Sequence, residues 1–311
     1  MVISVHPFDN FFSKLEDHNH HHESEAVSAA IQRFLAQISI RLNDVGFYLN
    51  KPTSEILSFS LIKRCFELLR IQHRAFAKLL VEIDYPVRKH EGSSGDEFLK
   101  YTLKLLDLLN SISSCIAHLG QARLKLSHAL TLVEASPSSA IDRLKPIGGS
   151  GCFSKELIKE GESGEICVEV EKSEKELVVC RALMIMKQIG FWVCGFVISG
   201  LSGDADAFME MRKSSREFGV SGLDRLDFPV HKAICESGVR LKEIKEVNDA
   251  VELLVASMAA GKSNDSAENL QKRLEVLEKE IDGLRKEVDS IFSDVLEERS
   301  KLLDCLRQRN Q

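Results

Sequence analysis

The amino-acid sequence predicts an all-α fold, an elongated bundle of about six long helices that ends in a coiled-coil-like helix. Only 6 prolines occur among 311 residues. The stretches between them repeat apolar residues at three- and four-residue steps, the period of a helix with one buried face. Strand-like alternation is nearly absent. The composition agrees, because 44% hydrophobic and 28% charged residues are ordinary for a globular chain.

The first two predicted helices occupy residues 25–49 and the stretch between Pro52 and Pro86. Thr53 or Ser54 marks the start of the second helix, which must stop before Pro86 because proline disrupts a helix interior. Both helices should turn one apolar face to a shared core. In the first helix this face consists of Val27, Ile31, Phe34, Ile38, Leu42, Val45 and Leu49.

The third predicted helix carries its apolar stripe over residues 98–133, about ten turns. It ends at "EASPSS", and the residues that follow are rich in Pro, Gly, Ser and Glu, the composition of a linker. We therefore predict four parts: a mobile N-terminus (1–23), N-terminal helical hairpins (24–135), a flexible linker (136–172), and C-terminal helices (173–311) that pack on the N-terminal ones as one bundle.

The fourth predicted helix, residues 174–201, contains "IGFWVCGFVISG" (189–200), which holds the only tryptophan and no charge. Such a uniformly apolar helix is expected at the centre of a large bundle. It also has small residues spaced four apart, which let neighbouring helices approach closely. Trp192 is expected to be buried. The candidate core or partner segment consists of Gly190, Trp192, Cys194, Gly195 and Ser199.

A membrane role for the apolar helix at 182–201 stays open. Crossing the hydrocarbon layer takes about 20 apolar residues, so a span would have to extend back and include Lys187. The favourable free energy of moving the apolar residues into the membrane is nearly cancelled by the unfavourable free energy of moving the lysine and the polar residues there. We therefore expect a buried helix, and keep peripheral membrane contact and a true span as alternatives.

Two further helices follow an uncertain, glycine-punctuated passage at 203–229. The first, at 239–260, is amphipathic. The second repeats apolar residues at steps of four and three, the heptad spacing that keeps one seam facing a partner, and Glu298 interrupts that seam. We expect the seam to pack inside the same molecule, with pairing to another copy as the alternative. The candidate coiled-coil seam consists of Leu270, Leu274, Leu277, Ile281, Leu284, Val288, Ile291 and Val295.

We predict no catalytic, cofactor-binding or metal-binding residues, and so no enzyme. "ASMAAGKS" (256–263) resembles a phosphate loop, but it follows an amphipathic helix and not a strand, so Gly261 is interpreted as a helix cap. No nucleophile elbow, zinc-protease helix, paired-cysteine metal site or dinucleotide fingerprint occurs. Five of the 8 cysteines fall in helical or apolar runs and are expected to be reduced thiols: Cys65, Cys115, Cys180, Cys194 and Cys305.

The charge pattern argues against a dedicated nucleic-acid binder. The net charge is −6, the pI is about 6.0, and no Lys/Arg-rich block offers the concentrated basic face that phosphates require. "MRKSSREF" places Ser215 three residues after Arg212, a context that basic-directed kinases use. Phosphorylation of Ser215 is therefore a hypothesis, which phosphopeptide mapping would test.

Six blocks, taken in order, resemble the plant BYPASS family, particularly its BYPASS-like members. The blocks are "EILSFSLIKRCFELL", "IDYPV", "LLDLLNSISSCIAHLGQARLKLSHALTLVE", "RALMIMKQIGFWVCGFVISGL", "LKEIKEVNDAVELL" and "LEKEIDGLRKEVDSIFSDVLEERSKLL". The resemblance covers most of residues 54–306, apart from the linker. It rests on long helical blocks and not on a catalytic signature, so it transfers no active-site residues.

The resemblance implies a plant-specific helical protein that controls root and shoot development by restraining a root-derived mobile signal. We accordingly expect a non-enzymatic regulatory or scaffold protein that binds protein partners through its helices. The alternative is a membrane-associated trafficking adaptor or tether that uses the helix at 182–201. The oligomeric state stays open.

The expected location is the cytoplasm, with attachment to an intracellular membrane if the apolar helix serves that purpose. One family member carries a chloroplast label. The acidic start of this chain, with Asp9, Glu16 and Asp17, does not favour carrying that label over.

Overall fold

The computed structural model describes residues 21–86, 93–149, 151, 173–216, 223–260 and 264–308. Most of the predicted N-terminal part (1–23), residues 152–172 of the predicted linker, and Gly261 lie outside the described residues. The described residues contain helices and no strand, which confirms the all-α prediction. The helices are α2 (His21–Tyr48), α3 (Thr53–Ile56), α4 (Phe59–Glu82), α5 (Ser94–Thr131), α6 (Pro137–Arg143), α8 (Glu174–Ser202), α9 (Asp206–Arg216), α10 (Asp224–Ser237), α11 (Lys242–Ala259) and α12 (Asn264–Gln308).

Serine side chains define the starts of three long helices. The hydroxyl of Ser58 accepts from the backbone N–H of Leu61 at the start of α4, and Ser93 and Ser173 do the same for α5 and α8. These caps satisfy N–H groups that have no partner within the helix. The cap at Ser58 also explains why the second predicted helix is divided into α3 and α4.

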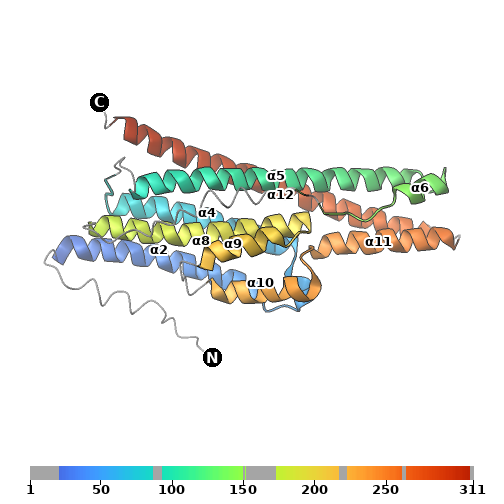
Figure 1. The fold of residues 1–311 in the computed structure, drawn as a ribbon, viewed down its shortest axis with the longest axis horizontal. Coiled ribbons are helices and arrows are strands. Elements are labelled where there is room, and N and C mark those ends of the chain that lie inside the picture. The colour runs from blue at the N-terminus through green and yellow to red at the C-terminus, as the bar shows by residue number, and fades with distance from the viewer. Residues whose placement is uncertain are drawn as a thin grey trace.

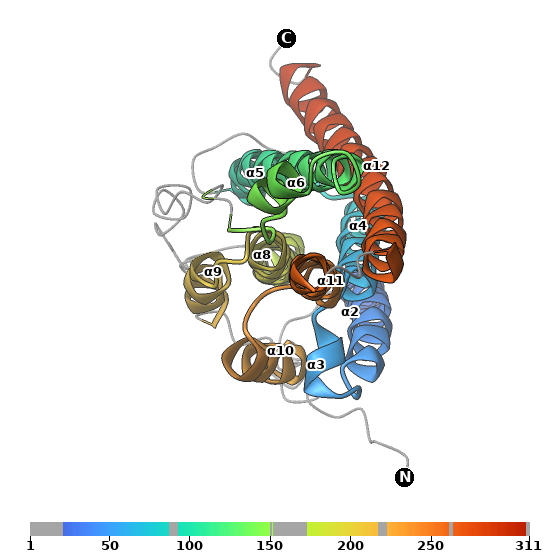
Figure 2. The ribbon, with the colours of Figure 1, turned by 90° about the vertical axis from the view of Figure 1, so that its right-hand side faces the viewer.

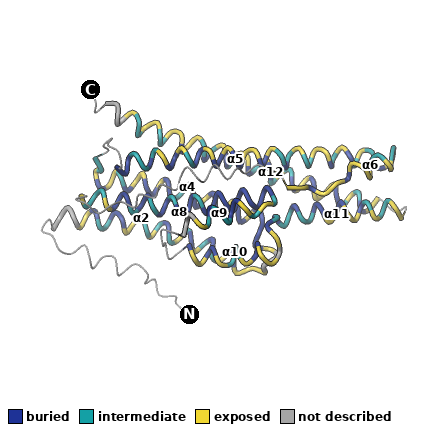
Figure 3. The backbone as a smooth tube through the Cα atoms, in the orientation of Figure 1, coloured by how far each residue is buried: buried dark blue, intermediate teal, exposed yellow. Residues whose placement is uncertain are grey.

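The helices form an elongated bundle around α8 (Figure 1). Viewed along the bundle, α8 lies near the middle, with α5, α4 and α9 around it (Figure 2), and it contacts α2 as well. Most of its residues are buried (Figure 3). The last helix, α12, contacts α11, α4 and α5, and its C-terminal end points away from the other helices (Figure 1). The apolar faces of all the long helices therefore meet in one core.

The uncertain passage at 203–229 contributes two helices to this arrangement. Gly203 ends α8, and Gly195 within α8 leaves room for α9, which packs along α8. Ala207, Phe208 and Met211 supply the buried face of α9. The described residues of this passage are therefore mostly helical, and Gly219 and Gly222 lie outside them.

The structure differs from the predicted flexible linker over its first third. Residues 137–143 form α6, and Ala140, Leu144 and Ile147 are buried in the core. The backbone N–H of Ile147 donates to Asn248 Oδ1 at 2.7 Å, and Asn248 Nδ2 donates to the Ile147 carbonyl at 3.3 Å. The composition, rich in Pro, Gly and Ser, predicted a flexible segment. It could not reveal the ordered structure, because the residue that anchors the segment, Asn248, lies 101 residues away on α11.

We expect Asn248→Asp to release residues 144–149 from α11. The carboxylate cannot donate to the Ile147 carbonyl, and a buried charge without sufficient partners is costly, so the free energy of unfolding should fall by about 1–3 kcal/mol. Hydrogen exchange would show faster exchange at Ile147 in the variant. Asp249→Asn, an exposed change one residue away, is the control; unchanged exchange at Ile147 in Asn248→Asp would contradict the prediction.

Candidate functional site

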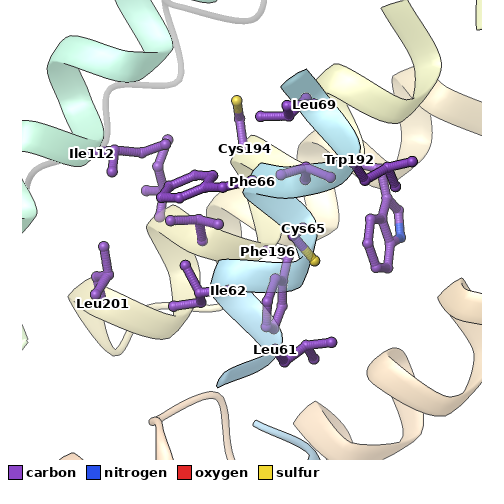
Figure 4. Packing of buried hydrophobic residues seen from close by; sticks show 14 of the residues in the cluster. Leu61, Ile62, Cys65, Phe66, Leu69, Ile112, Trp192, Cys194, Phe196 and Leu201 are labelled. Carbon is purple, nitrogen blue, oxygen red and sulfur yellow. The ribbon is translucent and has the colours of Figure 1, made fainter. Parts of the chain in front are cut away.

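The segment around Trp192 lies at the centre of the core. Trp192, Cys194 and Ser199 have no exposed surface, and Gly190 and Gly195 are also buried. Figure 4 shows Trp192, Cys194 and Phe196 of α8 among apolar side chains of α4 and α5. Any protein that contacts this segment would first have to displace α9 or another neighbouring helix.

Two glycines of α8 allow neighbouring groups to approach the backbone closely. A Cβ atom at Gly190 would lie 2.4 Å from Tyr101 Oη of α5, and one at Gly195 would lie 2.9 Å from Met211 Cβ of α9. Both distances are shorter than real carbon contacts. The small residues therefore set how closely α5 and α9 pack on α8.

Tyr101 uses the space above Gly190 to reach the backbone of α8. Its hydroxyl donates to the Met186 carbonyl at 3.2 Å, and Gln72 Nε2 of α4 lies 3.4 Å from both the hydroxyl and that carbonyl. Burial raises the pKa of Tyr101 well above its ordinary value, so the hydroxyl stays protonated and able to donate. This buried polar contact fixes the register of α4, α5 and α8.

A buried ion pair joins α8, α9 and α10. Trp192 Nε1 donates to Asp227 Oδ1 at 3.2 Å, and Arg212 Nε lies 2.7 Å from both carboxylate oxygens of Asp227. Asp227 is 6% exposed. The indole therefore contributes a hydrogen bond as well as apolar surface, and Arg212, which supplied the predicted kinase context, is a structural residue.

Lys187, the residue on which a membrane span depended, has an ion-pair partner. Lys187 Nζ lies 2.6 Å from Glu97 Oε2 of α5. Burial by itself would raise the pKa of Glu97, but the hydrogen bonds and charges of Lys187 and Lys100 hold it below its ordinary value. Among the described residues, α8 is the one helix long and apolar enough to cross a membrane, yet 83% of its most apolar window is buried by the rest of the chain.

This lowered pKa predicts a contribution to stability that acid removes. Because the folded-state pKa of Glu97 is depressed, the stabilisation is complete above the unfolded-state pKa and is lost as the pH falls through the folded-state pKa. We expect Glu97→Gln to lower the urea midpoint at neutral pH and to leave it nearly equal to wild type in acid. The exposed Glu268→Gln is the control; a deficit of Glu97→Gln that does not depend on pH would contradict the assignment.

The heptad seam of α12 packs inside the chain. Each of its eight residues is buried against helices of the same molecule, which leaves none of them available to another copy. Glu298, which interrupts the seam, lies 2.8 Å from Nδ1 of the buried His73 of α4. The polar residue in the seam is therefore matched by a polar residue in the facing helix.

The remaining predicted residues take no part in a site that the structure describes. Ser215 lies in α9, but its side chain is outside the described residues. Cys65, Cys115 and Cys194 are buried thiols outside any disulfide, and burial raises the pKa of the Cys194 thiol to about 12. The prediction of a free thiol is wrong for Cys180, which is disulfide-bonded. Periodicity reports burial and not the distance between sulfur atoms, which decides whether a disulfide forms.

The described residues contain no group of three or more His, Cys, Asp or Glu side chains able to hold a metal ion. A cavity of about 200 Å³ between α4 and α12 is lined by His73, Arg70, Glu298 and Lys301 among others. Several of its charged groups are paired: His73 with Glu298 and Lys301 with Glu297 inside the lining, and Arg70 with Glu287 outside it. These pairs join helices or support α12 and do not resemble a nucleophile with its base.

These features define a class: a helical protein with one continuous core, whose buried polar groups connect helices. Residues 151–304 match the family model described as Protein BPS1. This match bears out the resemblance of the helical blocks to the plant BYPASS family.

The relatives agree with this assignment. "Protein BPS1, chloroplastic" of Arabidopsis thaliana is 25% identical over 321 residues, which covers 97% of this chain and 90% of the relative. "UPF0496 protein 4" of Oryza sativa is 25% identical in subspecies indica and 24% in japonica, and the chain spans about half the length of these two relatives (50% and 53%). No solved structure matches the chain. The family match supports a plant developmental regulator, and the names of these relatives describe no enzymatic activity.

Proposed function

We propose that the protein is a non-enzymatic regulatory or scaffold protein of plant root and shoot development, and that it restrains a root-derived mobile signal through protein contacts. The match to this family supports the developmental role. One observation supports the scaffold role: the buried polar side chains that the structure describes form hydrogen bonds that connect helices of the bundle. Chemistry on a substrate would instead need polar groups that converge on a pocket.

The contacts are proposed to use the outer helical faces, because the Trp192 segment and the α12 seam are buried. Phe47 of α2 and Phe228 of α10 are 74% and 69% exposed. Their helices adjoin, since a Cβ at Gly46 would lie 3.6 Å from Leu226 Cδ2. Large exposed aromatic residues are enriched in protein interfaces. These two phenylalanines are therefore the first residues to test.

Affinity purification with mass spectrometry from plant tissue tests the scaffold role. We expect partners that the wild-type chain retains and that Phe47→Ser/Phe228→Ser loses, while both proteins unfold at the same urea concentration. Val81→Ser, which changes another exposed apolar residue on α4, is the control. Identical partners for all three proteins would reject this face.

Grafting tests the restraint of a mobile signal. A rootstock that lacks the protein should alter the development of a wild-type shoot, and the wild-type chain expressed in that rootstock should restore it. A defect confined to the tissue that lacks the protein would contradict a signal that moves from the root.

We propose a cytoplasmic location, and a fluorescent fusion distinguishes it from the chloroplast that the name of the Arabidopsis relative gives. The alternative role as a membrane-associated adaptor is not favoured, because Lys187 is paired with Glu97 and α8 is covered by other helices. A carbonate wash of a membrane fraction tests it, since a spanning protein would stay in the pellet.

A further inference from the structure

Helix α10 presents a histidine and a cysteine as neighbours on its outer side. The two residues, His231 and Cys235, are one helical turn apart, a spacing that places both side chains on the same face. Cys235 Sγ lies 3.7 Å from His231 Nε2 and 4.0 Å from His231 Nδ1. Cys235 is an exposed free thiol. Neither the family match nor the proposed scaffold role assigns a purpose to this pair.

The apolar face of α10 holds the pair in position. Val230, Ala233 and Ile234, which flank the two residues in the sequence, are buried in the core. The helix packs on α2 and α3. The histidine and the cysteine therefore lie on the outer side of a helix whose other side is fixed to the bundle.

The separation of the two donor atoms suits a tetrahedral zinc ion. Zinc binds cysteine sulfur at about 2.3 Å and histidine nitrogen at about 2.0–2.1 Å. At the tetrahedral angle of about 109°, these bond lengths place the sulfur and the nitrogen about 3.6 Å apart. The observed separation of Cys235 Sγ and His231 Nε2 is 3.7 Å. Both atoms can therefore bind one ion with little change in the distance between them, once the thiol has lost its proton.

The pair supplies only half of the ligands that such an ion takes. Structural zinc sites are almost always four-coordinate, and two cysteines with two histidines are a common set. Among the described residues, no third His, Cys, Asp or Glu side chain joins this pair. Asp227, one turn before His231, is buried and binds Arg212. A second copy of the chain would supply the same two ligands across a twofold axis, which completes the four.

The surroundings of the pair suit a second copy. Phe228 lies three residues before His231 on the same side of α10 and is 69% exposed, so a copy held at the ion would cover apolar surface. Lys232 pairs with Glu236 at 3.8 Å, which balances these two charges within each copy. Two copies of this face can therefore meet without a clash between these charges, which would oppose association if they were unpaired and of like sign.

We propose that His231 and Cys235 bind zinc together with the same two residues of a second copy, so that one Zn²⁺ ion with two cysteine and two histidine ligands joins two chains. A single chain provides an incomplete site, so zinc controls whether the chains pair. The inference does not depend on the scaffold role, because purified protein and metal alone test it.

Zinc titration of the purified full-length protein, with light scattering to measure mass, tests the proposal. We expect Zn²⁺ to double the mass of the 34.9 kDa chain, with one ion bound for two chains, and EDTA to restore the monomer. A disulfide between two Cys235 thiols would survive EDTA. Co²⁺ in place of zinc should give the absorption of a cobalt–thiolate bond, which the histidines at positions 18 and 20–22 cannot produce.

Substitutions on the outer side of α10 complete the test. Cys235→Ser and His231→Gln should each abolish the doubling of mass by zinc, and Cys235→Ser should also remove the cobalt–thiolate absorption. Lys232→Gln, which lies between the two ligands, is the control and should pair like the wild type. Matching urea midpoints would show that the bundle is intact; if one ligand variant has a lower midpoint, the other provides the test.

Three results would overturn the proposal without affecting the scaffold role. The first is a chain that stays at 34.9 kDa in zinc, even if it binds the ion. The second is a doubled mass that survives EDTA. The third is a Cys235→Ser variant that pairs in zinc as the wild type does.

Discussion

Gly190→Ala should lower the free energy of unfolding by about 3 kcal/mol, although alanine is the better helix former. The added Cβ would lie 2.4 Å from Tyr101 Oη, so the phenol must move away from α8. Overpacking a filled core costs about 1–3 kcal/mol, and the loss of the buried hydrogen bond from Tyr101 to the Met186 carbonyl adds about 1–3 kcal/mol. The higher helix propensity of alanine offsets about 1 kcal/mol of this loss in stability. Urea denaturation followed by circular dichroism measures the net change.

Gly283→Ala is the matched control for this prediction. Gly283 lies in α12, and nothing comes within 4 Å of a Cβ built there. The same substitution should therefore stabilise the protein by about 1 kcal/mol through helix propensity alone. Equal effects of the two substitutions would mean that Tyr101 does not hold α5 against α8 in the way the structure shows.

Periodicity predicted the long helices because each carries an apolar stripe that the core buries. The stripe of the first predicted helix is buried residue by residue, in α2 and at Leu49 just after it, and the helix predicted at 174–201 is α8 to within one residue. The same spacing also located Gly190 and Gly195 as places of close approach. These features are local, so a single segment of sequence contains the information for them.

Contacts between distant segments were not predictable in this way. Asp227 accepts from Trp192 across 35 residues, and Glu298 meets His73 across 225. A pattern within one helix cannot reveal which polar residue faces it from another. Glu298 is the exception, because a charged residue that interrupts an apolar seam requires a polar partner in the facing helix. Its position in the sequence therefore predicts that such a partner exists, but not which residue it is.

The packing of α12 also changes how partner binding should be tested. Removal of the chain after Ala260 would expose the buried faces of α4, α5 and α11 that α12 covers. Any loss of partners would then report unfolding and not a missing docking surface. Substitutions at exposed residues such as Phe228 avoid this ambiguity.

Asp227→Ala should destabilise the protein by about 3–5 kcal/mol, because it removes the carboxylate from a buried ion pair and leaves Arg212 and the Trp192 N–H without that acceptor. The only tryptophan of the chain reports the change directly. If α10 loosens from α8, the emission of Trp192 should shift to longer wavelength before the other helices unfold.

A double substitution separates the ion pair from the surrounding packing. Arg212→Met in the Asp227→Ala background removes the largely buried guanidinium that has lost its Asp227 partner, so the double variant should be more stable than Asp227→Ala alone. Asp282→Ala, which breaks the exposed ion pair with Arg285 on α12, should change stability by less than about 0.5 kcal/mol. If Asp227→Ala is as mild as Asp282→Ala, the contact among Trp192, Asp227 and Arg212 does not hold α9 and α10 on the core helix, and other contacts such as the buried apolar face of α9 must retain them.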